Sequence, residues 1–315
     1  MITRRSVRIK TMQYVYAYES TASAASSQFE QYLEKSILSV KDQYLYLLLC
    51  IREVSNFVEV DAKIKAGKFI KQDSDKNFNT KLLSNVIIQY LNNDKAFLAE
   101  ISQAKTAQLL DEDTIRQWYK IFIATPEYKA YLENGTEFNV DADRAIVKFL
   151  LDAVLLEDEN FNTIIEELFT NWADDAEYVV DAVHEVIQKS KNELKLHLEK
   201  GNLKEKFREL KQFGIDLFRI TIQNKKDHQV IIKPKLKNWE SDRLAMLDVI
   251  LIRMALAEFL DFPSIPVKVT INEYLDIAKE YSTPKSKDFI NGILDSIMKD
   301  LKSNSTLNKT GRGLL

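Results

Sequence analysis

Glycine and proline are scarce in this sequence, with 7 glycines and 5 prolines among 315 residues. An all-β fold needs many tight hairpin turns, and those turns are rich in exactly these two residue types. The shortage therefore argues against an all-β fold. Hydrophobic residues make up 45% of the chain, which is enough to bury a core. We expect an all-α protein that forms one large helical body or two to three sub-domains.

Cysteine and histidine are also rare. The one cysteine, Cys50, lies in an apolar run at 44–51, so neither an internal disulfide nor a cysteine-based metal site is available, and we expect a buried core residue. The three histidines, His184, His197 and His228, lack partners at metal-ligand spacing. We therefore expect no metal site.

Long hydrophobic runs are absent. No apolar stretch reaches the roughly 18 to 20 residues of a membrane span, and no apolar segment follows Arg4 and Arg5 as it does in a signal peptide. We expect a soluble, cytoplasmic protein without a membrane partner.

The motifs of common enzymes are missing too. The sequence has no phosphate-binding loop and no glycine-rich dinucleotide turn. Carboxylate pairs such as Asp174 and Asp175 fall on polar helix faces, where solvated charges are the usual interpretation. We predict that the protein is not an enzyme and needs no cofactor.

Charge is distributed unevenly along the chain. Residues 61–200 carry 17 basic and 26 acidic side chains (17 − 26 = −9), and the rest carries 27 basic and 21 acidic (27 − 21 = +6), which together give the net charge of −3. An acidic block is thus set into a mildly basic protein. We predict three parts: an N-terminal helical segment at 1–60, an acidic helical insertion at 61–200 and a C-terminal helical domain at 201–315.

Periodic apolar residues predict where the helices lie. The most apolar stretch, 240–261, is expected to form the central buried helix, with Asp248 and Arg253 paired or reaching an edge. Gly292 is expected to mark close packing or the approach of a ligand, and 226–238 and 303–315 are expected to be a connector and a frayed tail. Helix N-caps are expected at Asp111, Asp141 and Thr283. The other expected helices are 3–19, 29–66, 80–92, 95–104, 111–133, 141–156, 160–172, 174–200 and 202–225.

Basic residues crowd the start of the first expected helix. Arg4, Arg5, Arg8 and Lys10 lie there, and no acidic residue precedes Glu19. A helix N-terminus favours negative charge, so these cations fit poorly unless they bind phosphate. Tyrosines follow at 14, 16 and 18, and single-stranded RNA stacks its bases on aromatic rings. Two alternatives stay open: an ordinary solvated basic tail, and tyrosines that belong to the core.

Two parts of the sequence resemble the NusB family. The C-terminal part carries LIRMALAEFL at 251–260, a segment beginning IPVKVTINEYL at 265–279 and FINGILD at 289–295; the N-terminal part has arginines before TMQYVY at 11–16. The resemblance covers roughly 3–20 and 205–300, and is greatest to the long form of Bacteroidetes-type bacteria. It implies an all-α fold of two small bundles and a transcription antitermination factor. It also implies three partners: the boxA element of ribosomal RNA leaders, the ribosomal protein NusE and RNA polymerase.

The resemblance also implies which residues form the binding sites. It assigns RNA contact to the basic start of the first expected helix, to two later residues of that helix and to the segment 285–291. It assigns partner-protein contact to Tyr16 and Asp248. The expected RNA-binding residues are Arg4, Arg5, Arg8, Lys10, Gln13, Tyr16, Lys285, Phe289 and Asn291.

The acidic insertion at 61–200 has no counterpart in the short form of the family. Its charge disfavours RNA, so we expect it to pack on the bundles or to recruit another protein. Two alternative functions were weighed. An RNA methyltransferase with a NusB-like N-terminal domain needs a glycine-rich cofactor domain, for which this chain has too few glycines. A helical scaffold without specific RNA binding stays open.

Overall fold

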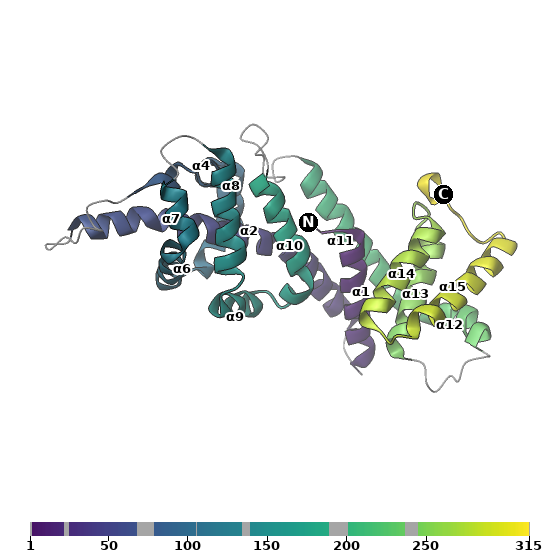
Figure 1. Cartoon of the computed structure of the whole chain (residues 1–315). Helices are drawn as coiled ribbons and strands as arrows, with labels where there is room; N and C mark the ends of the chain where they lie inside the picture. The colour runs from purple at the N-terminus through teal and green to yellow at the C-terminus, as the bar shows by residue number, and fades with distance from the viewer. Residues whose placement is uncertain are drawn as a thin grey trace. The chain divides into compact units, whose positions relative to one another are not determined.

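The computed structural model describes residues 2–21, 25–67, 79–104, 106–133, 139–188, 201–236 and 245–314. Every regular element within these ranges is a helix, which confirms the predicted all-α class (Figure 1). The chain forms two compact units. The first comprises Ser39–Glu205, and the second comprises Ile2–Leu38 together with Lys206–Leu315.

The boundary between the units falls inside one long helix, α2 (Ser26–Gly67). We expected the first boundary at residue 60, which lies inside the same helix. Residues 39–60 belong with the acidic segment because they form its core: Tyr44–Ile51 are all buried. Cys50 is fully buried in this run, as predicted, and burial raises the pKa of its thiol.

The first unit is built around α2. The Tyr46 ring lies 6.5 Å from that of Phe161 and 5.7 Å from that of Phe169, and Trp118 meets Phe161 edge-on at 5.4 Å. Trp118 also donates its indole N–H to Asp158 at 3.0 Å. The remaining elements of this unit are η1 (Lys81–Ser84), α4 (Val86–Asn93), α5 (Lys95–Ala104), η2 (Thr106–Leu109), α6 (Glu112–Ala124), α7 (Pro126–Glu133), α8 (Val140–Phe149), the π-turn η3 (Leu150–Leu155), α9 (Glu159–Leu168) and α10 (Trp172–Gln188).

Two helix starts in this unit test the predicted caps. Asp111 caps α6 by accepting from the backbone N–H of Thr114 at 2.8 Å, as predicted. The prediction of Asp141 was wrong, because Asn139 caps α8 by accepting from two backbone N–H groups. The expected helix 111–133 is two helices, since Pro126 lacks the N–H that would continue α6 and instead begins α7.

The second unit surrounds α13 (Met246–Asp261). All ten residues of Ile250–Phe259 are buried, which confirms the predicted central helix. Arg253 pairs with Glu19 and donates to the carbonyl oxygen of Thr221, as the paired alternative predicted. The other elements here are α1 (Arg4–Ser20), the start of α2, α11 (Gly201–Gln223), α12 (Lys225–Ile232), η4 (Lys233–Leu236), α14 (Val267–Tyr281), α15 (Ser286–Ser303) and η6 (Gly311–Leu314).

Three predictions in this unit were wrong. The expected connector at 226–236 is helical, as α12 and η4, and 237–238 lie outside the described residues. The expected frayed tail is held in place: Lys309 donates to the carbonyl oxygens of Glu258 and Phe262 at 2.9 and 3.0 Å, which caps the end of α13. α15 begins at Ser286, after Lys285, so Thr283 is not its N-cap.

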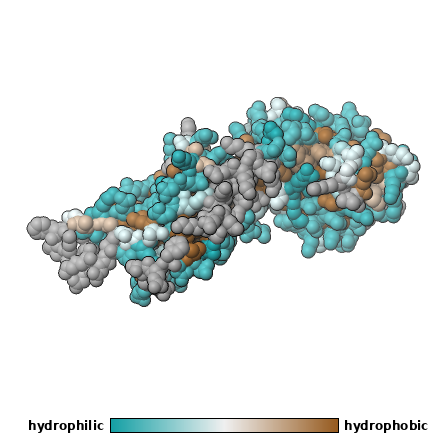
Figure 2. All heavy atoms as spheres, turned by 90° about the horizontal axis from the view of Figure 1, so that it is seen from above, coloured by the Kyte–Doolittle hydropathy of each residue, from teal (hydrophilic) through white to brown (hydrophobic). Residues whose placement is uncertain are grey.

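The surface seen in Figure 2 is mostly hydrophilic, with small separate apolar patches between the polar side chains. None of the described helices is both long and apolar enough to cross a membrane.

A buried polar cluster lies between α12 and α13. His228 is 1% exposed, and neither of its ring nitrogens has a hydrogen-bond partner. Burial, reinforced by the nearby charge of Arg253, lowers the pKa of His228 to about 4. The folded protein therefore keeps this imidazole neutral at pH values where an unfolded chain protonates it.

This cluster predicts a pH-dependent loss of stability. Between pH 6.5 and 4 the unfolded chain binds a proton at His228 that the folded chain does not, so the free energy of unfolding falls as the pH falls. Going from pH 7 to pH 5 should cost about 2 kcal/mol at this site. In urea denaturation, His228→Leu should lose less stability over this interval than the natural protein by that amount. Equal losses in the two proteins would contradict this assignment.

The two interior-helix glycines predict opposite effects of alanine. A Cβ at Gly292 meets nothing within 4 Å, which excludes close packing and leaves the other expected reason, the approach of a ligand, untested. Gly292→Ala should therefore stabilise the protein by about 0.5–1 kcal/mol. A Cβ at Gly214 lies 2.8 Å from Val7 and 2.9 Å from Ile37, so Gly214→Ala should destabilise it by about 1–3 kcal/mol. Urea denaturation of both variants tests the pair, and a destabilised Gly292→Ala would refute the first assignment.

Candidate nucleic-acid interface

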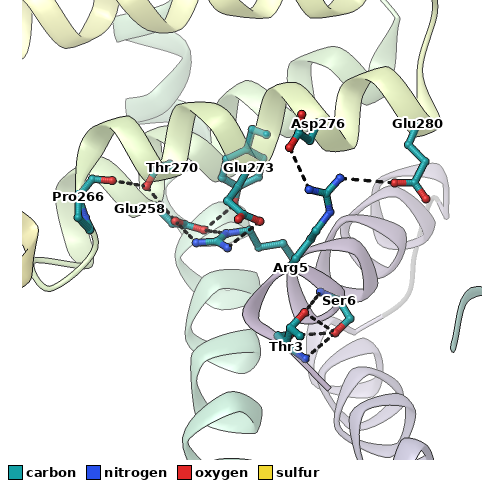
Figure 3. Close-up of polar contacts among 11 residues, drawn as sticks. Thr3, Arg5, Ser6, Glu258, Pro266, Thr270, Glu273, Asp276 and Glu280 are labelled. Atoms are coloured by element: carbon teal, nitrogen blue, oxygen red, sulfur yellow. Dashed lines mark hydrogen bonds and ion pairs between the residues drawn. The ribbon is translucent and has the colours of Figure 1, made fainter. Parts of the chain in front are cut away.

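The first turn of α1 is fixed by a reciprocal cap. The hydroxyl of Thr3 accepts from the backbone N–H of Ser6 at 3.2 Å, and the hydroxyl of Ser6 accepts from the backbone N–H of Thr3 at 2.8 Å (Figure 3). A cap of this kind sets where the helix begins. It therefore also sets which way each arginine of the first two turns points.

Arg8 points into the protein. Its side chain is 2% exposed, and its guanidinium forms two parallel hydrogen bonds with the carboxylate of Glu258, at 2.6 and 2.9 Å. The carboxylate also accepts from the hydroxyls of Tyr274 at 2.9 Å and Thr270 at 3.0 Å. Burial by itself lowers the pKa of Arg8, but the hydrogen bonds and charge of Glu258 outweigh it and raise the pKa above its usual value. The pair is charged and fully enclosed.

Arg5 lies on the surface beside α14. Its side chain is 39% exposed, and its guanidinium lies 3.0 Å from Asp276 and 3.7 Å from Glu280 (Figure 3). Surface ion pairs of this kind contribute little, typically about 0–1 kcal/mol. Arg5 can therefore leave its carboxylates for a stronger anion at small cost.

Arg4 has no carboxylate partner among the described residues. It is exposed, and its guanidinium carbon lies 5.6 Å from the centre of the Phe213 ring. A cation over an aromatic face is held in place without being neutralised. Sequence analysis assigned RNA contact to all three arginines, but the structure gives each a different environment.

The other predicted RNA-binding residues also divide between interior and surface. Lys285 and Asn291 are exposed, at the start of α15. Lys10 is 1% exposed and Phe289 is 4% exposed. Like Arg8, these two lie in the interior rather than on the surface that phosphate contact requires, because their helix faces pack on neighbouring helices.

Gln13 and Tyr16 line a groove of about 500 Å³ in the second unit. Tyr16 is 45% exposed. Asp248 lies beneath the groove rather than in it, 5% exposed, and accepts from the hydroxyls of Ser282 at 2.6 Å and Ser286 at 2.8 Å. The structure thus connects the two predicted partner-contact residues through Ser282. The lining residues are Met12, Gln13, Tyr16, Ala245, Met246, Leu247, Tyr281, Ser282 and Thr283.

Two residues of this region were missed by sequence analysis. Glu258 anchors Arg8, and a signal for it existed: a lone acidic residue in the apolar run 249–260 calls for a buried cation. Phe213, which lies under Arg4, gave no such signal, because an aromatic residue at helical spacing is normally a core residue.

Comparison with known proteins finds relatives of the C-terminal part of the chain. Residues 176–299 match the NusB family. Three relatives named transcription antitermination protein NusB align with about a third of the chain: those of Salinibacter ruber (45% identical over 105 residues), Chloroherpeton thalassium (45% over 105) and Koribacter versatilis (40% over 93). The matched segments span 66%, 50% and 64% of these relatives. No solved structure matches the chain.

The buried pair predicts a large difference between two arginines of one helix. Arg8→Met leaves Glu258 enclosed without its cation, so the free energy of unfolding should fall by about 3–5 kcal/mol. Arg4→Ala removes an exposed side chain and should change it by less than about 0.5 kcal/mol. Urea denaturation measures both values.

A double variant checks the cause of that difference. Arg8→Met combined with Glu258→Gln removes both charges and should recover part of the stability lost in Arg8→Met alone. If the double variant loses more free energy of unfolding than the two single variants lose together, the ion pair does not hold α1 in place.

Proposed function

We propose that this protein, whose residues 176–299 match the NusB family, is an RNA-binding transcription antitermination factor. It binds boxA-type single-stranded RNA of ribosomal RNA leaders together with the ribosomal protein NusE. With these partners it joins the antitermination complex on RNA polymerase. We propose that it acts by binding alone, without catalysis and without a cofactor.

The observation that carries this proposal is the start of α1. Arg4 is exposed and has no carboxylate partner in the part of the chain that the structure describes, and Arg5 pairs with two surface carboxylates. Cations at a helix N-terminus are disfavoured by the helix dipole unless an anion accompanies them. A phosphate backbone supplies that anion, and guanidinium groups bind it through paired hydrogen bonds.

We propose a division of roles among the predicted RNA-binding residues. Exposed side chains contact the RNA, and buried ones support the surface from within. Arg8, Lys10 and Phe289 belong to the second group, with Arg8 fixing α1 on α13 through Glu258. The proposed contact residues are Arg4, Arg5, Gln13, Tyr16, Lys285 and Asn291.

The groove beside Tyr16 is the proposed contact for NusE. Its lining combines apolar side chains, such as Met12, Met246 and Leu247, with the half-exposed ring of Tyr16. Protein interfaces favour aromatic and methionine side chains. Asp248 acts here by orienting Ser282, which lines the groove.

We propose that the first unit does not bind RNA. Residues 149–188 contain 11 aspartates and glutamates and no lysine or arginine. Phosphate is repelled by such a surface at the short range over which exposed charges act in salt. We propose that this unit instead recruits another protein.

Fluorescence anisotropy with a boxA-like RNA tests the proposed activity. The natural protein should bind boxA more tightly than a scrambled RNA, and NusE should strengthen that preference. Arg4→Ala with Arg5→Ala should weaken binding about tenfold or more, because two phosphate contacts are lost. The control is Lys226→Ala, which removes an exposed cation of α12. Equal weak binding to both RNAs, with and without NusE, would leave a helical scaffold instead.

Photo-crosslinking tests the role of the first unit. An RNA carrying 4-thiouridine should crosslink to peptides from 2–38 and 206–314. Crosslinks concentrated in 79–188 would show that the acidic unit binds RNA after all. An excess of unlabelled boxA RNA should remove the expected crosslinks, which controls for chance encounters.

A further inference from the structure

A second groove in the same unit lies at the start of α1. It encloses about 550 Å³, within the range typical of small-molecule sites. Its walls come from α1, from α11 and from the connection between α13 and α14. The lining residues are Arg4, Arg208, Glu209, Gln212, Phe213, Asp216, Phe262, Ser264 and Ile265.

The floor of this groove is aromatic. Phe213 and Phe262 meet edge-on with their ring centres 5.4 Å apart. The guanidinium of Arg4 lies over Phe213 at 5.6 Å, and the buried guanidinium of Arg8 lies 5.4 Å from the same ring. Phe213 is thus flanked by two cations, one anchored inside the protein and one facing the groove. Arg4 is oriented by the ring while its charge stays available.

The polar groups of the groove are balanced in charge. Arg4 and Arg208 contribute two cations, and Glu209 and Asp216 contribute two carboxylates. Gln212 is exposed and donates to Asp216 at 2.7 Å. A groove without net charge does not favour a string of phosphates. It fits one flat, polar, uncharged ring, with donors and acceptors on its edge and a phosphate beside Arg4.

We propose that this groove binds one unstacked nucleobase of a single-stranded RNA. The base stacks on Phe262 beside the guanidinium of Arg4, and its edge meets the amide of Gln212 and the carboxylates. Bases stack well on both aromatic rings and arginine planes. This inference rests on the proposed RNA binding and extends it to α11, whose residues neither the family match nor the sequence pattern assigns to RNA.

The test pairs protein variants with RNAs that each lack one base. A boxA-like RNA is made with a single abasic nucleotide at each position in turn, and its affinity is measured for the natural protein, Phe262→Leu and Gln212→Ala. One abasic position should weaken binding to the natural protein roughly 5- to 100-fold, the usual worth of a stacked base. The same abasic change should weaken the RNA affinity of Phe262→Leu less than about twofold, because this variant already lacks the ring on which the base stacks.

Two controls keep the result interpretable. Lys226→Ala alters an exposed cation of α12 that does not line the groove, and should respond to every abasic RNA as the natural protein does. Gln212→Ala replaces an exposed side chain and should fold normally. Its response to the same abasic RNA therefore tests the inference even if Phe262→Leu folds poorly.

The possible outcomes separate this inference from the proposed function. If the natural protein prefers boxA but no abasic position couples to Phe262→Leu or Gln212→Ala, the groove does not bind a base, while the proposed function stands. If the variants weaken NusE binding and leave RNA binding unchanged, the groove binds a protein side chain and the inference is overturned. If no RNA binds specifically, both fail together.

Discussion

The buried ion pair between Arg8 and Glu258 is the interaction on which the second unit depends most. Two charges removed from water cost several kcal/mol each, and only a full set of hydrogen bonds offsets that cost. Glu258 receives four: two from Arg8, one from Tyr274 and one from Thr270. The pair thereby joins α1 to α13 and α14 in one fixed geometry. A shifted α1 would leave a buried charge unpaired.

This anchor explains how the basic helix start, which we propose as an RNA-binding surface, is held in place. With Arg8 fixed inside, Arg5 and Arg4 point to solvent on either side of it, one beside α14 and one above Phe213. The capping box of Thr3 and Ser6 holds the helix end that carries them. Binding groups held in place before the ligand arrives lose less entropy on binding. The tail of the chain supports the same region, since Lys309 caps the end of α13 directly after Glu258.

Sequence reasoning recovered the elements better than the roles of individual side chains. Apolar periodicity located most helices, and the apolar run around Arg253 correctly identified the central one. The roles of Arg4 and Arg8 were not separable, because they are the same residue type on the same helix and differ only in which neighbour each face meets. The boundary inside α2 was invisible for a similar reason: nothing local interrupts that helix, and only the packing of Tyr44–Ile51 assigns it to the first unit. The cap at Asn139 was missed because Asp141, an equally good capping residue, lies two positions later.

The central claim is that Arg4 meets phosphate and Arg8 does not. The salt dependence of RNA affinity measures this directly, since each phosphate contact on single-stranded RNA adds about 0.7 to the slope of log affinity against log salt. We expect Arg4→Ala to lower the slope by about 0.7. We expect Arg8→Met to keep the slope of the natural protein, measured where that variant is still folded. A lowered slope in Arg8→Met with an unchanged one in Arg4→Ala would contradict the proposed phosphate contact of Arg4.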